Sequence, residues 1–279
     1  MDKTIPSRLS LRCYSKKRPI RAAFSVTDKG TPLHSHDYYE VEIIVDGEAI
    51  HNLNSDNYRI AAGSAYILGP ASFHSYDIKK TLSLFCLNFD GSVIPEKLFF
   101  KMVTLGAGKS IELSKERFAD VVKLCEMLVK ESKRKDGGCS VELCACILAM
   151  LLEQVDGEEN FTERFDLGMQ RALLYLYSHF YESPSLKDVA KEANYHPNYF
   201  SEMFTAYFGQ SFSSKLNDLK TNYAKVLLQS GFSVTETCFR SGFCSMSSFL
   251  KVFKKNTGMS PKKYKDLHIS KSATKKEKS

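Results

Sequence analysis

The chain has 279 residues, and its 43% hydrophobic and 25% charged residues suffice for one large packed core or two ordinary ones. This composition excludes a disordered or fibrous chain. The longest uninterrupted apolar run covers residues 143–152, whereas a membrane-spanning helix needs about 20 apolar residues, and no apolar segment follows the basic residues near the N-terminus. We therefore expect a soluble, unexported, cytoplasmic protein with no membrane partner.

The eight cysteines include no C-x-x-C pair and show none of the regular spacing of a disulfide framework or a zinc site. Cys144 and Cys146 stand two positions apart in a helical pattern, where side chains point in different directions and make a poor metal clamp. We expect reduced cysteines that act mostly as small buried hydrophobic residues.

Charge is divided unevenly along the chain, whose net charge is +7. Residues 1–167 carry 22 Lys and Arg against 24 Asp and Glu, whereas residues 168–279 carry 17 against 8. A nucleic-acid backbone is the commonest partner of such a basic surface, although lysines at the C-terminal end supply part of the charge. The division predicts a basic binding surface in the C-terminal part.

The first part of the chain, up to about residue 90, consists of short β-prone runs separated by turn residues. Residues 41–45 and 48–53 flank Asp46-Gly47, and this pattern predicts a hairpin because Asp-Gly suits the positive φ angles of a type I′ turn. Many short strands at even spacing favour a β-sandwich or a small barrel.

Two stretches of helical periodicity follow the β-prone part. Apolar residues repeat at helical spacing in residues 118–129 and 143–155, and a polar loop at residues 132–138 separates them. The pattern predicts a helical hairpin at residues 111–157. Both helices can simply cover the barrel, but the second is apolar on nearly all sides, so we expect it to hold a second subunit in a homodimer.

The C-terminal part of the sequence repeats itself at an offset of 48 to 49 residues. In each copy a short amphipathic segment ends at a turn residue, Asn194 or Gly242, of a type that adopts the left-handed conformation at low cost. A second segment follows, whose phenylalanines four residues apart form a buried face and leave the opposite face exposed. Two helices joined by a tight turn, the second with a polar exposed face, indicate a helix-turn-helix.

Apolar residues at helical spacing from Phe212 to Leu227 join the two copies. They predict a single connecting helix of about 18 residues, roughly 27 Å long. Because the major groove recurs about every 34 to 36 Å along one face of DNA, such a rigid connector can place two recognition helices in successive major-groove segments. A plain helical bundle would explain the periodicity, but not the duplication together with the positive charge.

Residues 169–265 resemble the DNA-binding domain of the AraC/XylS family of bacterial transcription regulators. The resemblance rests on residues 186–204, LKDVAKEANYHPNYFSEMF, and on residues 242–261, GFCSMSSFLKVFKKNTGMSP. In the second block Gly-Phe is followed by Phe-x-x-x-Phe-Lys-Lys and Gly-x-Ser-Pro, a highly specific combination. The resemblance implies two helix-turn-helix units that bind one DNA duplex.

The resemblance also implies which side chains contact DNA. They are Asn198, Ser201, Glu202, Ser245, Met246, Ser247, Leu250, Lys251, Lys254, Lys255 and Lys262. Asn, Glu and Lys can hydrogen-bond to base edges, and Met and Leu can contact a thymine methyl group. The last three lysines are expected at backbone phosphates, which position the protein without specifying a sequence.

The N-terminal part is similar to the cupin-type sensor barrel that often precedes this DNA-binding domain. The similarity rests on residues 34–40, Gly47, Gly63 and residues 70–74. It implies an effector pocket, with sugars as the commonest class of effector. The expected lining residues are His34, His36, Tyr38, Glu40, Tyr66, His74 and Asn88.

The histidines of this set leave three interpretations open. In metal-dependent cupins the matching positions, His34, His36, Glu40 and His74, would bind a divalent transition metal. The same residues can instead line a pocket for an organic effector, or serve a structural role, since residues i and i+2 of a strand share a face. We adopt the pocket wall, and we predict no bound metal and no other cofactor.

Together these features predict a transcription regulator rather than an enzyme. The protein is expected to bind double-stranded promoter DNA and a small-molecule effector and, as an activator, to contact RNA polymerase. The alternative is a metal-dependent cupin enzyme fused to a DNA-binding domain, against which we find no separate catalytic base.

The expected fold class is multi-domain β plus α. A cupin-like β-barrel at residues 1–110 carries the helical hairpin at residues 111–157. After a linker at residues 158–167, an all-α AraC-type DNA-binding domain at residues 168–268 holds two helix-turn-helix units joined by a long helix. Residues 269–279 are expected to form a disordered basic tail.

Overall fold

The computed structural model of the chain describes residues 7–9, 19–106, 108, 110–155 and 165–276. The chain forms two compact units, one covering Ser7–Leu174 and one that contains the helices from Tyr175 onward. Their boundary falls within one helix, α4 (Leu167–His179). Among the described residues, no helix combines the length and the apolar composition that a membrane crossing requires.

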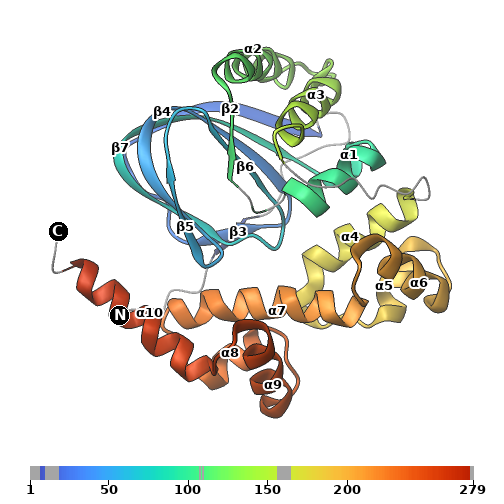
Figure 1. Ribbon diagram of the computed structural model, residues 1–279. Helices are drawn as coiled ribbons and strands as arrows, with labels where there is room; N and C mark the ends of the chain where they lie inside the picture. The colour runs from blue at the N-terminus through green and yellow to red at the C-terminus, as the bar shows by residue number, and fades with distance from the viewer. Residues whose placement is uncertain (1–6, 10–18, 107, 109, 156–164, 277–279) are drawn as a thin grey trace. The chain divides into compact units, whose positions relative to one another are not determined.

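The first unit is built around a sheet of eight strands in its described part. The strands are β1 (Ser7–Leu9), β2 (Ile20–Thr27), β3 (His34–His36), β4 (Tyr39–Leu53), β5 (Asp56–Ile60), β6 (Ser64–Leu68), β7 (His74–Phe89) and β8 (Ser110–Glu112). The long strands β4 and β7 pair antiparallel along their whole length; β2 and β3 also pair with β7, and β5 and β6 with β4. Figure 1 shows this sheet curled into a barrel, as the sequence predicted.

The hairpin predicted at Asp46-Gly47 is wrong, because β4 continues through these residues as a bulge. The pairing of β4 with β7 shifts register around Gly47, whose φ is 101°. A Cβ atom on Gly47 would lie 2.1 Å from the carbonyl oxygen of Thr81. Asp-Gly thus supplies the positive φ and the close backbone approach of a β-bulge. The chain reverses at Asn54 instead, with φ of 56°, between β4 and β5.

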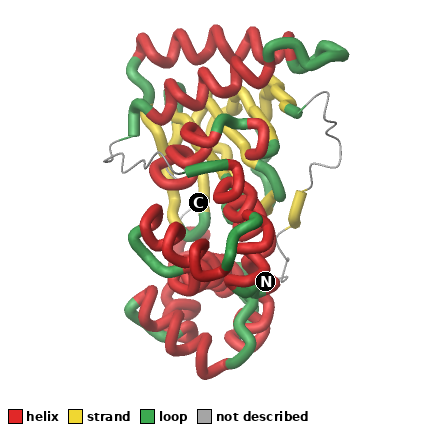
Figure 2. The backbone as a smooth tube through the Cα atoms, turned by 90° about the vertical axis from the view of Figure 1, so that its right-hand side faces the viewer, coloured by secondary structure: helices red, strands yellow, loops and turns green. Residues whose placement is uncertain are grey.

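Helices cover part of the barrel. They are α1 (Glu96–Lys101), a 3₁₀ turn at Gly91–Val93, a π-helical segment at Met102–Gly106, α2 (Lys115–Glu131) and α3 (Ser140–Leu152). The α2 and α3 helices lie side by side across the strands, at the top of Figures 1 and 2. An ion pair of 2.8 Å between Arg117 and Glu153 connects them. The predicted helical hairpin is confirmed, whereas its role in dimerisation stays a prediction.

The second unit is helical. Beyond α4 and a 3₁₀ turn at Phe180–Glu182, its helices are α5 (Leu186–Ala193), α6 (Pro197–Phe208), α7 (Phe212–Gln229), α8 (Val234–Arg240), α9 (Met246–Thr257) and α10 (Pro261–Lys276). The connecting helix α7 has 18 residues, as the periodicity predicted. In Figure 1, α5 and α6 lie toward one end of α7, and α8 and α9 lie toward the other.

The two copies of the sequence repeat form the same local structure. Asn194 after α5 and Gly242 after α8 have φ angles of 57° and 87°, so both predicted turn residues adopt the left-handed conformation. Each first helix begins with a reciprocal capping box, from Ser185 in one copy and Ser233 in the other. Phe200 and Phe204 of α6 and Phe249 and Phe253 of α9 are fully buried, which confirms the predicted buried faces.

Two predicted segments fall partly outside the described residues. Residues 158–164 of the predicted linker are among those not described, and α4 begins at Leu167. Helix α10 extends to Lys276, into the segment that the sequence assigned to a disordered tail. No Gly or Pro interrupts residues 262–276, so nothing in the local sequence ends the helix earlier. Residues 277–279 lie outside the described part.

Candidate functional site

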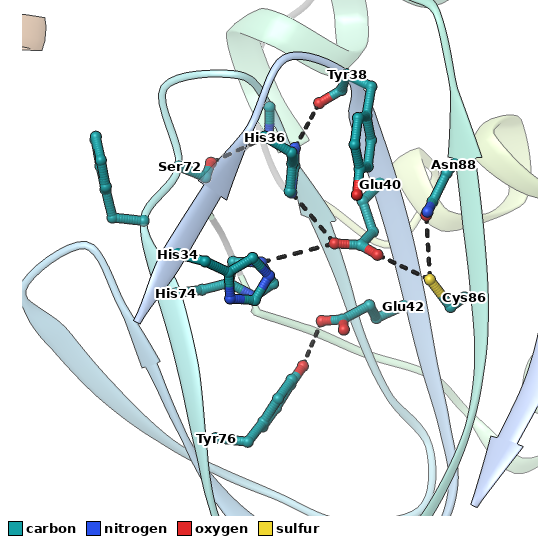
Figure 3. Close-up of polar contacts among 12 residues, drawn as sticks. His34, His36, Tyr38, Glu40, Glu42, Ser72, His74, Tyr76, Cys86 and Asn88 are labelled. Carbon is teal, nitrogen blue, oxygen red and sulfur yellow. Dashed lines mark hydrogen bonds and ion pairs between the residues drawn. The ribbon is translucent and has the colours of Figure 1, made fainter. Parts of the chain in front are cut away.

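The structure brings four of the predicted effector residues together inside the barrel (Figure 3). His34 and His36 lie at the two ends of β3, Glu40 lies in β4, and His74 begins β7. The Nε2 atoms of His36 and His74 lie 3.2 and 3.6 Å from Oε2 of Glu40. The His34 ring packs against the His74 ring, with centroids 4.2 Å apart. Pairing of His34 with His74 in the sheet produces this arrangement.

Tyr38 and Asn88 also reach this cluster. The Tyr38 ring stacks on His36 at a centroid distance of 4.3 Å, and its carbonyl oxygen accepts a hydrogen bond of 2.7 Å from Nδ1 of His36. Cys86 donates to a Glu40 oxygen at 2.8 Å and lies 3.1 Å from the Asn88 amide. Six of the seven predicted residues, all but Tyr66, therefore belong to one cluster, which His34 joins through its contact with His74.

Tyr66, the remaining predicted residue, contacts a histidine that the sequence analysis did not single out. Its buried ring lies edge-on to His51 at 4.4 Å, and its hydroxyl accepts a hydrogen bond of 3.1 Å from Ser110. The pKa of Tyr66 is raised to about 12, chiefly by burial. His51 Nε2 in turn lies 3.3 Å from Nδ1 of His74, so the cluster of imidazoles extends farther along the barrel than predicted.

A second carboxyl group completes the cluster. The Tyr76 hydroxyl donates a hydrogen bond to Glu42, and both groups are buried. Sequence reasoning missed this pair, although the signal was present: Glu42 is two residues from Glu40, and Tyr76 is two residues from His74, on the same faces of their strands.

Burial determines the protonation states in the cluster. It lowers the pKa of His51 to about 3 and lowers that of His74 well below its usual value, so both imidazoles are neutral at pH 7. Burial also raises the pKa of Glu42 well above its usual value, and the charge of Glu40 adds to this effect. In Glu40 burial acts in the same direction, but the adjacent His36 imidazole outweighs it, so the pKa lies below its usual value.

The metal set of the cupin resemblance fits this structure in part. The Nε2 atoms of His36 and His74 are buried without a hydrogen-bond partner, and with a Glu40 oxygen they form a group whose ligand atoms all lie within 4.8 Å of one another. His34 is not in that group. If a metal is bound, these three residues can hold it as two imidazole nitrogens and one carboxylate oxygen, a donor set that suits divalent transition metals.

The predicted base-contacting residues lie on the two recognition helices, α6 and α9. Asn198 and Glu202 are exposed near the start of α6, and Ser201 between them is half-buried. Ser247, Leu250 and Lys251 are exposed on α9. In both helices these side chains lie opposite the buried phenylalanines, which leaves each polar face open to a partner.

Ser245 and Met246 also have structural roles. The Ser245 side chain accepts a hydrogen bond of 3.3 Å from the backbone N–H of Ser248 and so caps α9. Met246 is half-buried against the apolar core around Phe249. Both roles reduce the surface that these two residues can offer to a base.

The three lysines assigned to phosphates, Lys254, Lys255 and Lys262, are exposed. Sequence reasoning missed two exposed residues at the start of the same recognition helices, Tyr199 in α6 and Ser248 in α9. Tyr199 stands three residues before Glu202, and Ser248 stands three residues before Lys251. This spacing was the available signal, because residues i and i+3 share a helix face.

Comparisons with known proteins agree with this division of the chain. Residues 189–266 match the family described as a helix-turn-helix domain, and residues 20–98 match the family described as the AraC-like ligand binding domain. Along 291 aligned positions the chain is 25% identical to the HTH-type transcriptional activator RhaR of Yersinia pestis bv. Antiqua (strain Angola), and the alignment covers 95% of each protein.

Two further similarities cover different shares of the chain. The uncharacterized HTH-type transcriptional regulator YobQ of Bacillus subtilis (strain 168) is 31% identical over 109 residues, which cover 39% of this chain and 45% of YobQ. The crystal structure of ToxT from Vibrio cholerae O395 is 16% identical, with a TM-score of 0.40, over 89% of this chain and 98% of ToxT.

RhaR and YobQ are both named as transcriptional regulators, and neither they nor the matched families support the enzyme alternative. The two matched domains stand in the order that the sequence predicted, and the RhaR alignment runs through both. The chain therefore belongs to the AraC family of DNA-binding transcription regulators.

Proposed function

We propose that this protein is a transcriptional activator that reads promoter DNA with both α6 and α9. The observation that supports the proposal most strongly is the duplicated helix-turn-helix, whose two recognition helices each have an exposed polar face. The net positive charge of residues 168–279, 17 Lys and Arg against 8 Asp and Glu, supplies the attraction to phosphate that all DNA binding needs.

The individual contacts follow from the chemistry of each side chain. Asn198 suits adenine, Glu202 can accept a hydrogen bond from cytosine, and Lys251 can donate to guanine. Lys254, Lys255 and Lys262 neutralise phosphates and fix the position of the helices on the duplex. With Ser245 and Met246 engaged in the structure of α9, we assign base reading in the second unit chiefly to Ser247, Leu250 and Lys251.

Regulation follows from the barrel, in which a small effector binds next to Glu40. An effector changes DNA binding only if it has different affinities for two arrangements of the protein. We further propose that the protein is a homodimer held by α2 and α3, that it contacts RNA polymerase as its named relative's title of activator suggests, and that it acts in the cytoplasm, where promoter DNA is accessible.

The test is selection of binding sites from a random DNA library with the full-length protein, followed by fluorescence anisotropy at several salt concentrations. We expect one enriched sequence with two half-sites about one helical turn apart, bound at least 1,000-fold more tightly than scrambled DNA. In transcription with purified RNA polymerase, that sequence upstream of a promoter should raise transcript yield. Binding that is equally tight for every sequence would refute the proposal.

A further inference from the structure

The cluster inside the barrel contains two groups of metal-binding side chains that share His74. The first is His36, Glu40 and His74, and the second is Glu42, His51 and His74. In each group the ligand atoms all lie within 4.8 Å of one another, and all five residues are buried. They come from β3, β4 and β7, so the pairing of three strands brings them together. Figure 3 labels His36, Glu40, Glu42 and His74 of this set.

The distances in the cluster match those between ligands of one metal ion. A tetrahedral ion with bonds of about 2.0 to 2.1 Å separates neighbouring ligand atoms by about 3.3 Å. The two separations between the imidazoles and Glu40 Oε2 are 3.2 and 3.6 Å. His51 Nε2 lies 3.3 Å from the other ring nitrogen of His74, Nδ1, where a hydrogen bond would orient the ring rather than bind the same ion.

The hydrogen bond of His36 fixes the direction of its lone pair. A backbone carbonyl can only accept, so the 2.7 Å contact with the Tyr38 oxygen makes Nδ1 of His36 the protonated nitrogen in the neutral ring. Nε2 then presents a lone pair toward the Glu40 carboxylate. Metal-binding histidines characteristically donate their other ring N–H to a carbonyl or carboxylate in this way.

The unpartnered nitrogens are the second, independent observation. Nε2 of His36 and Nε2 of His74 are buried and near Glu40, yet neither makes a hydrogen bond with it. Leaving a buried polar atom unsatisfied costs about 1 to 3 kcal/mol. A cation between the two nitrogens and the carboxylate would satisfy all three atoms.

The cluster differs from the set that the cupin resemblance implies. His34 belongs to that set, but in the structure its Nδ1 contacts the carbonyl oxygen of Pro32 at 2.9 Å and it is in neither group. Glu42 and His51, which the resemblance does not assign, lie beside His74 instead. Comparing how much His34 and His51 each contribute to metal binding therefore tests directly which of the two sets binds the ion.

We propose that the effector of this regulator is a divalent transition metal ion, bound by His36, Glu40 and His74 and supported by His51 and Glu42. Imidazole and carboxylate ligands suit ions such as Zn²⁺, Co²⁺, Ni²⁺ and Mn²⁺. The spacing of the ligand atoms accommodates a single ion. The effector role, though not the metal site, rests on the proposed function above.

The binding test uses the full-length, tag-free protein, freed of metal with a chelator and titrated with Co²⁺ and Zn²⁺ by calorimetry and visible absorption. We expect one Co²⁺ per chain, with the absorption bands of a nitrogen and oxygen site and no thiolate-to-metal band. A thiolate-to-metal band would instead indicate binding by cysteines, of which Cys139, Cys146 and Cys244 are exposed.

Four substitutions separate the residues. We expect His36→Gln to weaken metal binding at least about 100-fold and His51→Gln about 10- to 100-fold, with a smaller effect for His34→Gln. His179→Gln, on α4, removes a histidine far along the chain and serves as the matched control with unchanged affinity. Circular dichroism and thermal melting in the presence of chelator check that each variant folds. If a variant does not fold, the metal stoichiometry and absorption spectrum of the wild-type protein still decide whether the metal site exists.

Several results would overturn the metal site. They are no stoichiometric ion in the wild-type protein, a thiolate band, unchanged affinity in His36→Gln, or a larger loss for His34→Gln than for His51→Gln. The first result is also what a simple buried ion pair between protonated His36 and Glu40 predicts.

The effector role is tested by DNA affinity with and without metal, on the sequence selected as described above. We expect a change of about 5- to 150-fold that a chelator reverses. Unchanged DNA affinity in metal-loaded protein would refute the effector role while leaving the proposed DNA-binding function intact. Metal binding by a protein that recognises no DNA sequence would refute the proposed function while leaving the metal site intact.

Discussion

Replacing Gly242 by alanine tests how the second helix-turn-helix is held together. Gly242 ends the turn after α8, with φ of 87°, and a Cβ atom there would lie 2.5 Å from the backbone carbonyl oxygen of Tyr181. The Ser183 hydroxyl donates to the Gly242 carbonyl, so the two segments are fixed against each other. A backbone oxygen cannot rotate away as a side chain can, and the turn itself has to move.

The Gly242→Ala substitution is expected to lower the free energy of unfolding for two reasons. The left-handed conformation costs an alanine roughly 1 to 2 kcal/mol. The forced shift adds about 1 to 3 kcal/mol, as for other overpacked sites. Gly258→Ala is the matched control, because Gly258 has φ of 76° but nothing within 4 Å of its would-be Cβ atom. The entropic gain of removing a glycine from the unfolded chain is the same in both variants and cancels.

Urea unfolding followed by far-ultraviolet circular dichroism, together with DNA affinity, measures the difference. We expect Gly242→Ala to lose about 1 to 3 kcal/mol more than Gly258→Ala and to bind DNA more weakly. Equal losses in the two variants would show that the approach to Tyr181 does not constrain the turn, and the steric argument would fail.

Other predictions concern single side chains. Lys251→Ala should reduce discrimination between the selected and a scrambled site by about 1 to 3 kcal/mol, and equal weakening of both sites would remove Lys251 from the base-reading set. Lys262→Ala should instead weaken all DNA equally and reduce the salt slope by about 1 in the same anisotropy titrations. Ser233→Ala removes a helix cap and should cost about 1 kcal/mol in urea unfolding; an unchanged midpoint would contradict the capping role. Hydrogen bonds from Ser185 lower the pKa of Asp188 from 3.8, so its contribution to stability is present above that pH and is lost as pH falls through the lowered pKa. Melting temperatures between pH 2 and 6 should therefore fall less steeply in Asp188→Asn, and parallel curves would refute this.

The helical unit could be predicted closely because its signals are local. The capping serines, the glycines after α6 and α9 and the paired phenylalanines act within a few residues of where they stand. Asn194 and Gly242 take the left-handed conformation because few other residue types adopt it at low cost. The pattern of such residues, written twice, was sufficient to locate both helix-turn-helix units.

The candidate metal cluster could be predicted only in part, because β4 changes its register at the bulge. Strict alternation along a strand places His51 and Glu42 on opposite faces, since their positions differ by an odd number. The register shifts between Ile44 and Ala49 turn His51 toward the same interior as Glu42. Asp46-Gly47 favours a hairpin as strongly as a bulge, and only pairing with β7 distinguishes the two.

The sequence by itself determined the order of the two domains, the duplicated helix-turn-helix and the exposed faces of α6 and α9, because each depends on short-range periodicity and backbone preference. Tertiary structure alone decided which side chains meet His74. Those contacts join residues of β3, β4 and β7 through strand register, and register is set by long-range pairing that no local pattern encodes.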